Sequence, residues 1–309
     1  MAKVGWNALA AWRDERMGER GDLWHRALID PTLLKVVGPV RGLRVLDLAC
    51  GNGYLTRRYA RQGAKLSVGV DASSATLAFA RRRERDHPSG ARFLRRNASA
   101  LAGIPDGVFD RVVANMALQD IHDAAGAVQE VSRVLARSGR FIFSLSHPCF
   151  DLDDRSVWVV ERARSDDGRL HDVVWRKVRN YREERAVRVP WDMSGQEVGF
   201  TTSYHRTLAT WARILREAGL AIVRLEEPSP LPRMIQASAQ GQFLREIPLH
   251  LVVEARHHPS LGAKRQRSRA TRPASRTSVR TRRRAAPRSG SGGRRRGSGF
   301  WHRGSKTGS

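Results

Sequence analysis

The chain has 309 residues, 40% of them hydrophobic, which is enough for one large α/β domain with a sizeable core. Its formal net charge is +26. However, 16 Lys and Arg and no acidic residue lie in residues 260–309, so 26 minus 16 leaves +10 for the preceding 259 residues. The extreme basicity belongs largely to one end of the chain, and it does not by itself indicate a nucleic-acid-binding domain.

The cysteine content and hydropathy pattern exclude several classes. The two cysteines, Cys50 and Cys149, lie far apart and neither has metal-ligand spacing, so we expect no disulfide framework and no metal site. No stretch of about 18 apolar residues occurs, and residues 1–21 lack the apolar core of a signal peptide. We therefore expect a cytoplasmic protein with no membrane partner. Its oligomeric state stays open.

Residues 1–40 predict a helical N-terminal cap on the edge of a sheet. Trp6, Trp12 and Trp24 stand at positions compatible with amphipathic helices, and an apolar run follows Pro31. A functional interpretation, in which Trp24 and His25 help to close a ligand site, remains open beside the packing interpretation, which we favour.

The stretch from Val45 to Leu55 predicts a buried strand that runs into a glycine turn and opens a helix. Gly51 and Gly53 let a ligand approach bare backbone, and the helix offers free N–H groups at its start. Asp47 just before them would repel the pyrophosphate of a dinucleotide but attract a cofactor that carries an ammonium and a sulfonium. The pattern therefore favours S-adenosylmethionine.

This motif resembles that of the class I, Rossmann-like S-adenosylmethionine-dependent methyltransferases, here of the small-molecule type. The chain has Ala49 where the family most often has its first glycine. The resemblance implies an α/β fold with a seven-stranded, mostly parallel sheet and helices on both faces. It also implies a cofactor site formed by the turn, namely by Asp47, Ala49, Gly51, Asn52 and Gly53.

Three further strand ends continue the predicted cofactor site. A strand at residues 66–70 ends on Asp71 and Ala72, and an acid there can accept two hydrogen bonds from ribose hydroxyls, although a helix N-cap is the alternative role. Asn97 and Ala98 follow a strand at 91–96, where the resemblance implies contact with the adenine amino group. Asn115 and Met116 end the strand at 109–115, and the resemblance implies that they flank the methionine part of the cofactor.

Residues 128–258 predict the rest of the sheet and an insertion. The helical periodicity of Val128, Val131 and Leu135 ends near residues 138–139, and a fifth strand at 140–145 leads to His147. Residues 147–203 break the strand–helix alternation, and residues 157–160 and 173–175 predict an antiparallel hairpin in a substrate-cover insertion. Strands at 220–225 and 249–255 complete a methyltransferase domain over residues 1–258.

Residues 259–309 are rich in Arg, Ser and Gly and almost free of aliphatic residues, which predicts a disordered basic tail. Its Arg clusters could bind RNA or another polyanion without sequence preference. A dispensable extension is the interpretation that we favour.

Methyl transfer needs few catalytic residues, because the enzyme mainly positions the acceptor and, for a hydroxyl, removes a proton. We rank His147 first and His205 second as the base, with His122, Tyr204 and Arg206 as substrate-binding residues. The main hypothesis is methyl transfer to the O, N or C atom of a small molecule. The alternatives are an RNA methyltransferase tethered by the tail, a non-catalytic nucleic-acid-binding protein on the same scaffold and, more remotely, a nicotinamide-dependent dehydrogenase.

Overall fold

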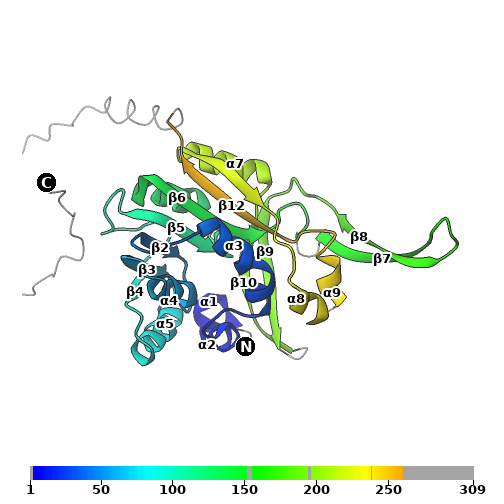
Figure 1. The fold of residues 1–309 in the computed structure, drawn as a ribbon, viewed down its shortest axis with the longest axis horizontal. Helices are drawn as coiled ribbons and strands as arrows, with labels where there is room; N and C mark the ends of the chain where they lie inside the picture. The colour runs from blue at the N-terminus through cyan, green and yellow to red at the C-terminus, as the bar shows by residue number, and fades with distance from the viewer. Residues whose placement is uncertain (1–2, 152–154, 194–195, 238, 260–309) are drawn as a thin grey trace, which may run out of the picture. The chain divides into compact units, whose positions relative to one another are not determined.

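A seven-stranded sheet is the centre of the fold (Figure 1). The computed structural model describes residues 3–151, 155–193, 196–237 and 239–259. The strands of the sheet are β2 (Arg44–Leu48), β3 (Leu66–Asp71), β4 (Arg92–Arg95), β5 (Phe109–Asn115), β6 (Leu135–Ser146), β11 (Leu220–Glu226) and β12 (His250–His257). Their order is β11-β12-β6-β5-β2-β3-β4, and β12 alone in this sheet runs antiparallel to both of its neighbours. The predicted mostly parallel, Rossmann-like sheet is confirmed.

Helices cover both faces of this sheet. The helices are α1 (Gly5–Ala8), α2 (Ala10–Met17), a π-helix (His25–Ile29), α3 (Asp30–Val37), α4 (Tyr54–Arg61), α5 (Ser74–Asp86), a 3-10 turn (Leu118–Asp120), α6 (Ala124–Val134), α7 (Leu208–Glu217), α8 (Pro232–Ala237) and α9 (Ala239–Phe243). Successive strand residues point to opposite faces. In β6, Ile142 accordingly packs in the cluster that contains α3 and α4, whereas Phe143 packs against Trp211 of α7.

The insertion after β6 consists of two hairpins. The predicted hairpin is confirmed as β7 (Ser156–Arg164) paired with β8 (Leu170–Val178). A second hairpin, of β9 (Arg185–Met193) and β10 (Gln196–His205), follows it. The short β1 (Lys3–Val4) pairs with β10 in parallel, which places the beginning of the described chain beside the insertion.

One helix boundary was predicted wrongly. Helix α6 ends at Val134 instead of near residues 138–139, because Leu135 already pairs with Phe109 at the start of β6. Leu135 is thus buried because it belongs to a strand, and its helical spacing from Val128 and Val131 is a coincidence. Three assignments remain predictions. They are the methyltransferase domain at residues 1–258, the N-terminal cap at 1–40 and the substrate cover at 147–203. The tail predicted for 259–309 lies, from residue 260 onward, outside the described residues.

Candidate active site

The turn between β2 and α4 depends on left-handed backbone. Ala49, Gly51 and Gly53 have φ angles of 53°, 57° and 75°, which turn the chain sharply at the strand end. A Cβ on Gly53 would overlap the ring of Phe93 in β4, so this glycine is required by space as well as by conformation. Ala49 adopts the same left-handed region at a steric cost that glycine would not have.

A cavity of about 230 Å³ opens at the carboxyl ends of the parallel strands. The predicted cofactor residues that line it are Asp47, Ala49, Gly51, Asn52, Asp71, Ala72, Asn97, Ala98, Asn115 and Met116. Gly53, also predicted, forms the N-cap of α4 and is not among the lining residues. The structure therefore brings the ends of β2, β3, β4 and β5 together around one space.

Asp71 stabilises the glycine turn by hydrogen bonding. One of its carboxylate oxygens accepts a hydrogen bond from the backbone N–H of Gly51 at 2.9 Å, and the other accepts one from Ser73 at 2.8 Å. Each oxygen keeps a further lone pair for a second donor. Burial raises the pKa of Asp71 above its ordinary value. Asp71 thus has the hydrogen-bonding capacity that a ribose diol requires.

Asp47 lies buried beneath the turn. Its carboxylate accepts a hydrogen bond from the Thr56 hydroxyl at 2.6 Å. Burial, with the nearby charges of Asp71 and Asp30, raises the pKa of Asp47 to about 7. A cationic ligand in the cavity would favour the ionised form of this carboxyl and would in turn be attracted by it.

The other two strand ends differ in how their asparagines are bonded. The side-chain oxygen of Asn97 accepts hydrogen bonds from the N–H and the hydroxyl of Ser99. Asn115 donates to Asp30 and to the Tyr54 hydroxyl, and accepts from Ser144 at 2.5 Å. Asn115 is therefore held rigidly by three partners, whereas Asn97 is held by a local turn.

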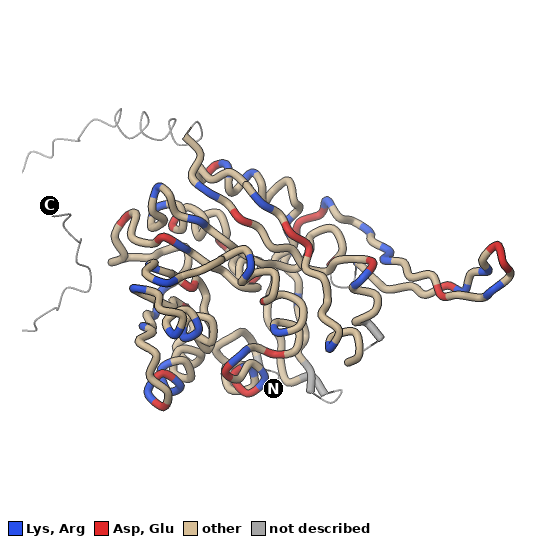
Figure 2. Tube along the Cα trace, in the orientation of Figure 1, with Lys and Arg blue, Asp and Glu red and all other residues tan. Residues whose placement is uncertain are grey.

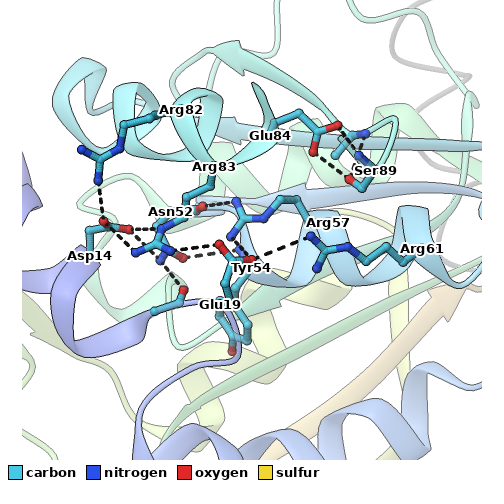
Figure 3. A network of polar contacts seen from close by, with 12 residues as sticks. Asp14, Glu19, Asn52, Tyr54, Arg57, Arg61, Arg82, Arg83, Glu84 and Ser89 are labelled. Carbon is cyan, nitrogen blue, oxygen red and sulfur yellow. Dashed lines mark hydrogen bonds and ion pairs between the residues drawn. The ribbon is translucent and has the colours of Figure 1, made fainter. Parts of the chain in front are cut away.

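A network of polar contacts fastens α2 to the glycine turn (Figure 3). The Asn52 amide donates to Asp14 at 3.0 Å and to the carbonyl of Gly18 at 2.9 Å. Arg83 of α5 in turn forms ion pairs with Asp14 and Glu19. Since Arg13 and Met17 line the cavity, this network holds one of its walls in place.

The sequence did not identify several residues on the cavity wall. Trp6, Arg13, Tyr54 and Asp120 line it, as does His25, which was considered only as part of a lid. Burial raises the pKa of Asp120 to about 7, against the hydrogen bonds from Ser203 and Trp6. An acid in a 3-10 turn after β5 carries no local sequence signal of this kind, because its burial comes from segments that are distant in the chain.

The two predicted bases do not line this cavity. The backbone N–H of Cys149 donates to Nδ1 of His147, so the proton of this ring is on Nε2. Nε2 lies 3.1 Å from Oε1 of Glu227. Burial lowers the pKa of His147. Nε2 of His205 lies 2.8 Å from the carbonyl of Tyr181. The catalytic roles predicted for His147 and His205 therefore find no support in the geometry.

A second cavity, of about 170 Å³, lies under the β9–β10 hairpin and is lined by Tyr204, His205 and Arg206. Arg206 donates to the carbonyls of Ile121 and His122 and lies over the Tyr204 ring. The His122 ring contacts Tyr204 edge-on with centroids 5.2 Å apart. The three predicted substrate residues form one cluster, but it does not line the first cavity.

The described residues contain neither a metal-binding cluster nor a membrane-spanning helix. No group of three or more His, Cys, Asp or Glu that could hold a metal ion occurs there. Within the same described part of the chain, no helix is long and apolar enough to cross a membrane.

Comparison with known proteins identifies the domain. Residues 46–143 match the family described as "Methyltransferase domain". A malonyl-[acyl-carrier protein] O-methyltransferase from Halorhodospira halophila is 35% identical over 45% of this chain and 46% of its own length. A demethylmenaquinone methyltransferase from Thermus thermophilus is 36% identical over 38% of this chain and 52% of its own length. The chain thus spans about half the length of these two relatives.

Among solved structures, an S-adenosylmethionine-dependent methyltransferase from Mesorhizobium loti is 29% identical, with a TM-score of 0.60. The match covers 74% of this chain and 96% of that one. It therefore extends well beyond the glycine turn. By its domain match and its fold, the chain contains a methyltransferase domain of the class I, Rossmann-like kind, similar to an S-adenosylmethionine-dependent methyltransferase of known structure.

Proposed function

We propose that the protein transfers the methyl group of S-adenosylmethionine to a small-molecule acceptor, and that the larger cavity is the site of this reaction. The observation that carries the proposal is the wall formed by Trp6, Arg13 and Met17 over the strand ends. A cavity enclosed in this way suits a small acceptor better than a base within a polymer. The relative from Thermus thermophilus supports this class, since its name specifies demethylmenaquinone.

The residues present fit the cofactor in charge and in hydrogen-bonding capacity. In the proposed arrangement Asp71 and Asn97 bind the adenosine part, and Asn115 and Met116 lie by the methionine part. Two carboxyls on the wall, the buried Asp47 and the half-buried Asp120, would stabilise a cation in the cavity. When bound, the cofactor supplies a methyl carbon that its sulfonium has already activated. The chain's own residues then need only to orient the acceptor and move its proton.

The cofactor site is tested by calorimetry of S-adenosylmethionine and S-adenosylhomocysteine binding. We expect Asp71→Ala to abolish measurable binding, whereas Asp86→Ala, at the exposed end of α5, leaves it unchanged. Thermal unfolding of each variant verifies that it is folded. Unchanged affinity in a folded Asp71→Ala protein would contradict the assignment.

The acceptor class is tested with radiolabelled S-adenosylmethionine and a bacterial extract. We expect label in the small-molecule fraction, and Asp71→Ala as the control should give none. Label in RNA would replace the small-molecule proposal with the tethered RNA methyltransferase. The acceptor atom follows from the hydrolytic stability and mass spectrum of the product.

Polyanion binding and cellular location are two further proposals, and both come from the sequence. A polyanion contact through residues 260–309 rests on their 16 Lys and Arg, while basic and acidic residues are interspersed over the described elements (Figure 2). Filter binding of RNA to the full chain should weaken when Arg282–Arg284 and Arg294–Arg296 are changed to Ser. A cytoplasmic location is consistent with the free thiols of Cys50 and Cys149.

A further inference from the structure

A histidine–aspartate pair lies on the wall of the larger cavity. His25 lines the cavity and is only 6% exposed. Its Nδ1 lies 2.7 Å from a carboxylate oxygen of Asp22, which also accepts the backbone N–H of His25 at 3.1 Å. Arg13 donates to the other oxygen of Asp22 at 3.0 Å. Three hydrogen bonds therefore fix Asp22, and Asp22 fixes the orientation of the imidazole.

This pair determines which ring nitrogen carries a proton. Burial alone would raise the pKa of Asp22, but the hydrogen bond from His25 and the charges of His25 and Arg13 outweigh it and hold this pKa well below its usual range. Asp22 is therefore ionised and can only accept hydrogen bonds. Nδ1 of a neutral His25 must then carry the proton, which leaves a lone pair on Nε2. Within the described part of the chain, no protein group is hydrogen-bonded to this Nε2.

His25 stands at the end of the cavity that Asn115 and Met116 form. Its ring meets the Tyr54 ring edge-on at 6.1 Å, and the Tyr54 hydroxyl is bonded to Asn115. Met116 packs against the apolar cluster that contains residues 27–29, the next turn of the same helix. That turn is a π-helix, a rare and costly geometry that is frequent at functional sites.

We propose that His25 is the general base of the methyl transfer and that Asp22 is its positioning residue. Nε2 of His25 takes the proton of an acceptor O–H or N–H. The electron pair released on that atom forms the bond to the methyl carbon, and the carbon–sulfur bond breaks with its pair on sulfur. The imidazolium later gives its proton to solvent. This inference rests on the proposed function and narrows it to acceptors that lose a proton from oxygen or nitrogen.

The charged groups around the ring are compatible with this role. Asp30 of α3 supplies a negative charge near His25, and Arg13 of α2 is neutralised by Asp22. Burial raises the pKa of Tyr54 well above its ordinary value, so this phenol stays neutral. Burial lowers the pKa of His250 in β12 to about 3, so it adds no competing positive charge. The rival base is Asp120, which also lines the cavity.

The first experiment measures the proton positions of His25 without any acceptor. In ¹⁵N-labelled full-length protein saturated with S-adenosylhomocysteine, long-range ¹H–¹⁵N spectra at pH 7.5 should show protonated Nδ1 and unprotonated Nε2. Asp22→Asn should mix or reverse this tautomer, because an amide can donate to Nδ1. An Nε2–H tautomer, or an imidazolium that persists to pH 9, would overturn the inference whether or not an acceptor is known.

The second experiment compares variants with one of three probes that must lose a proton from oxygen or nitrogen: catechol, a 1,4-naphthoquinol or benzylamine. His25→Asn places an amide where Nδ1 was and removes Nε2, so we expect kcat to fall about 10²- to 10⁴-fold with unchanged S-adenosylhomocysteine affinity. Asp22→Asn should lower kcat and change the pH dependence of kcat. Asp22→Glu should restore part of the rate and part of the wild-type pH dependence. His171→Asn, on the exposed β8, is the matched control.

The outcomes separate this inference from the proposed function. Wild-type activity retained in His25→Asn but lost in Asp120→Asn would assign the base to Asp120 and refute the role of His25. No transfer to any probe or to the extract would contradict the proposed function, while the tautomer measurement would still decide the state of His25.

Discussion

The two sides of the cavity are built in different ways. On the sheet side, backbone conformation and hydrogen bonds from backbone N–H groups hold the residues, as in the turn from Ala49 to Gly53 and the bond from the Gly51 N–H to Asp71. On the N-terminal side, long side chains hold α2 through ion pairs of Asp14 and Glu19. The first kind of support depends on the φ angle and close packing of single residues, whereas the second can be loosened in steps. The molecule thus combines a rigid cofactor platform with an ionically fastened wall.

The sheet side should be broken most severely by Gly53→Ala. The new Cβ overlaps the Phe93 ring in a left-handed conformation, and we expect a loss of about 3 kcal/mol in the free energy of unfolding. Gly51→Ala is the matched control, since its φ is also positive but nothing lies within 4 Å of its Cβ. It should lose only about 1 kcal/mol. Urea unfolding measures both, and equal losses would refute the steric explanation.

The N-terminal wall should respond strongly to Arg83→Met and weakly to Arg82→Met. Both arginines pair with Asp14, at 2.8 Å and 3.7 Å, but Arg83 is 21% exposed and Arg82 is 55% exposed. Breaking the Arg83 pair leaves a buried carboxylate and should cost about 2 kcal/mol, against less than about 0.5 kcal/mol for Arg82. Only Arg83→Met should also weaken cofactor binding. A similar loss in both variants would mean that the network does not fasten the wall.

Cofactor affinity should depend on pH through Asp47. Its folded pKa of about 7 is raised from 3.8, so this group stabilises the fold at pH below 4 and that contribution is lost as pH rises towards 7. Cation affinity changes with pH in the opposite direction, because a cation binds to the ionised form of Asp47. Between pH 6 and pH 8 we expect about tenfold tighter binding of S-adenosylmethionine, as the ionised fraction rises about tenfold.

Calorimetry at the two pH values measures this change, with Asp47→Asn as the variant that should lose the part due to this carboxyl and keep only the part due to Asp120. S-adenosylhomocysteine, which has no sulfonium, is the matched ligand and should show a smaller change. An equal pH dependence for both ligands would show that the carboxyl does not respond to the sulfonium.

The smallest expected effect concerns Ala49. Replacement by glycine removes the strain of a left-handed φ of 53° but adds freedom to the unfolded chain, so we expect a net stabilisation of about 0.5 kcal/mol. Ala78→Gly, in the middle of α5, should instead destabilise by about 1 kcal/mol. If Ala49→Gly destabilises as much as the control, the left-handed turn carries no strain.

The sheet side could be predicted from sequence because its signals are local. Apolar strands, glycines and the acids at strand ends lie within a few residues of each other, and these residues line one cavity. The N-terminal wall could not be predicted from sequence, because Trp6 and His25 reach the cavity only through contacts with segments far along the chain. The position of His147 likewise depends on a distant segment. Its backbone N–H pairs with Leu249, an extension of the antiparallel contact with β12, and its ring lies beside Glu227 instead of the cavity.

The pairing of β1 with β10 has a consequence for synthesis of the protein. Lys3 is paired with Gly199, and Trp6 of the following helix packs against Trp191 with ring centroids 5.5 Å apart. Nearly two hundred residues must therefore leave the ribosome before the first strand finds its partner, and such distant contacts form slowly. Until then, residues 3–8 remain open to proteases and chaperones.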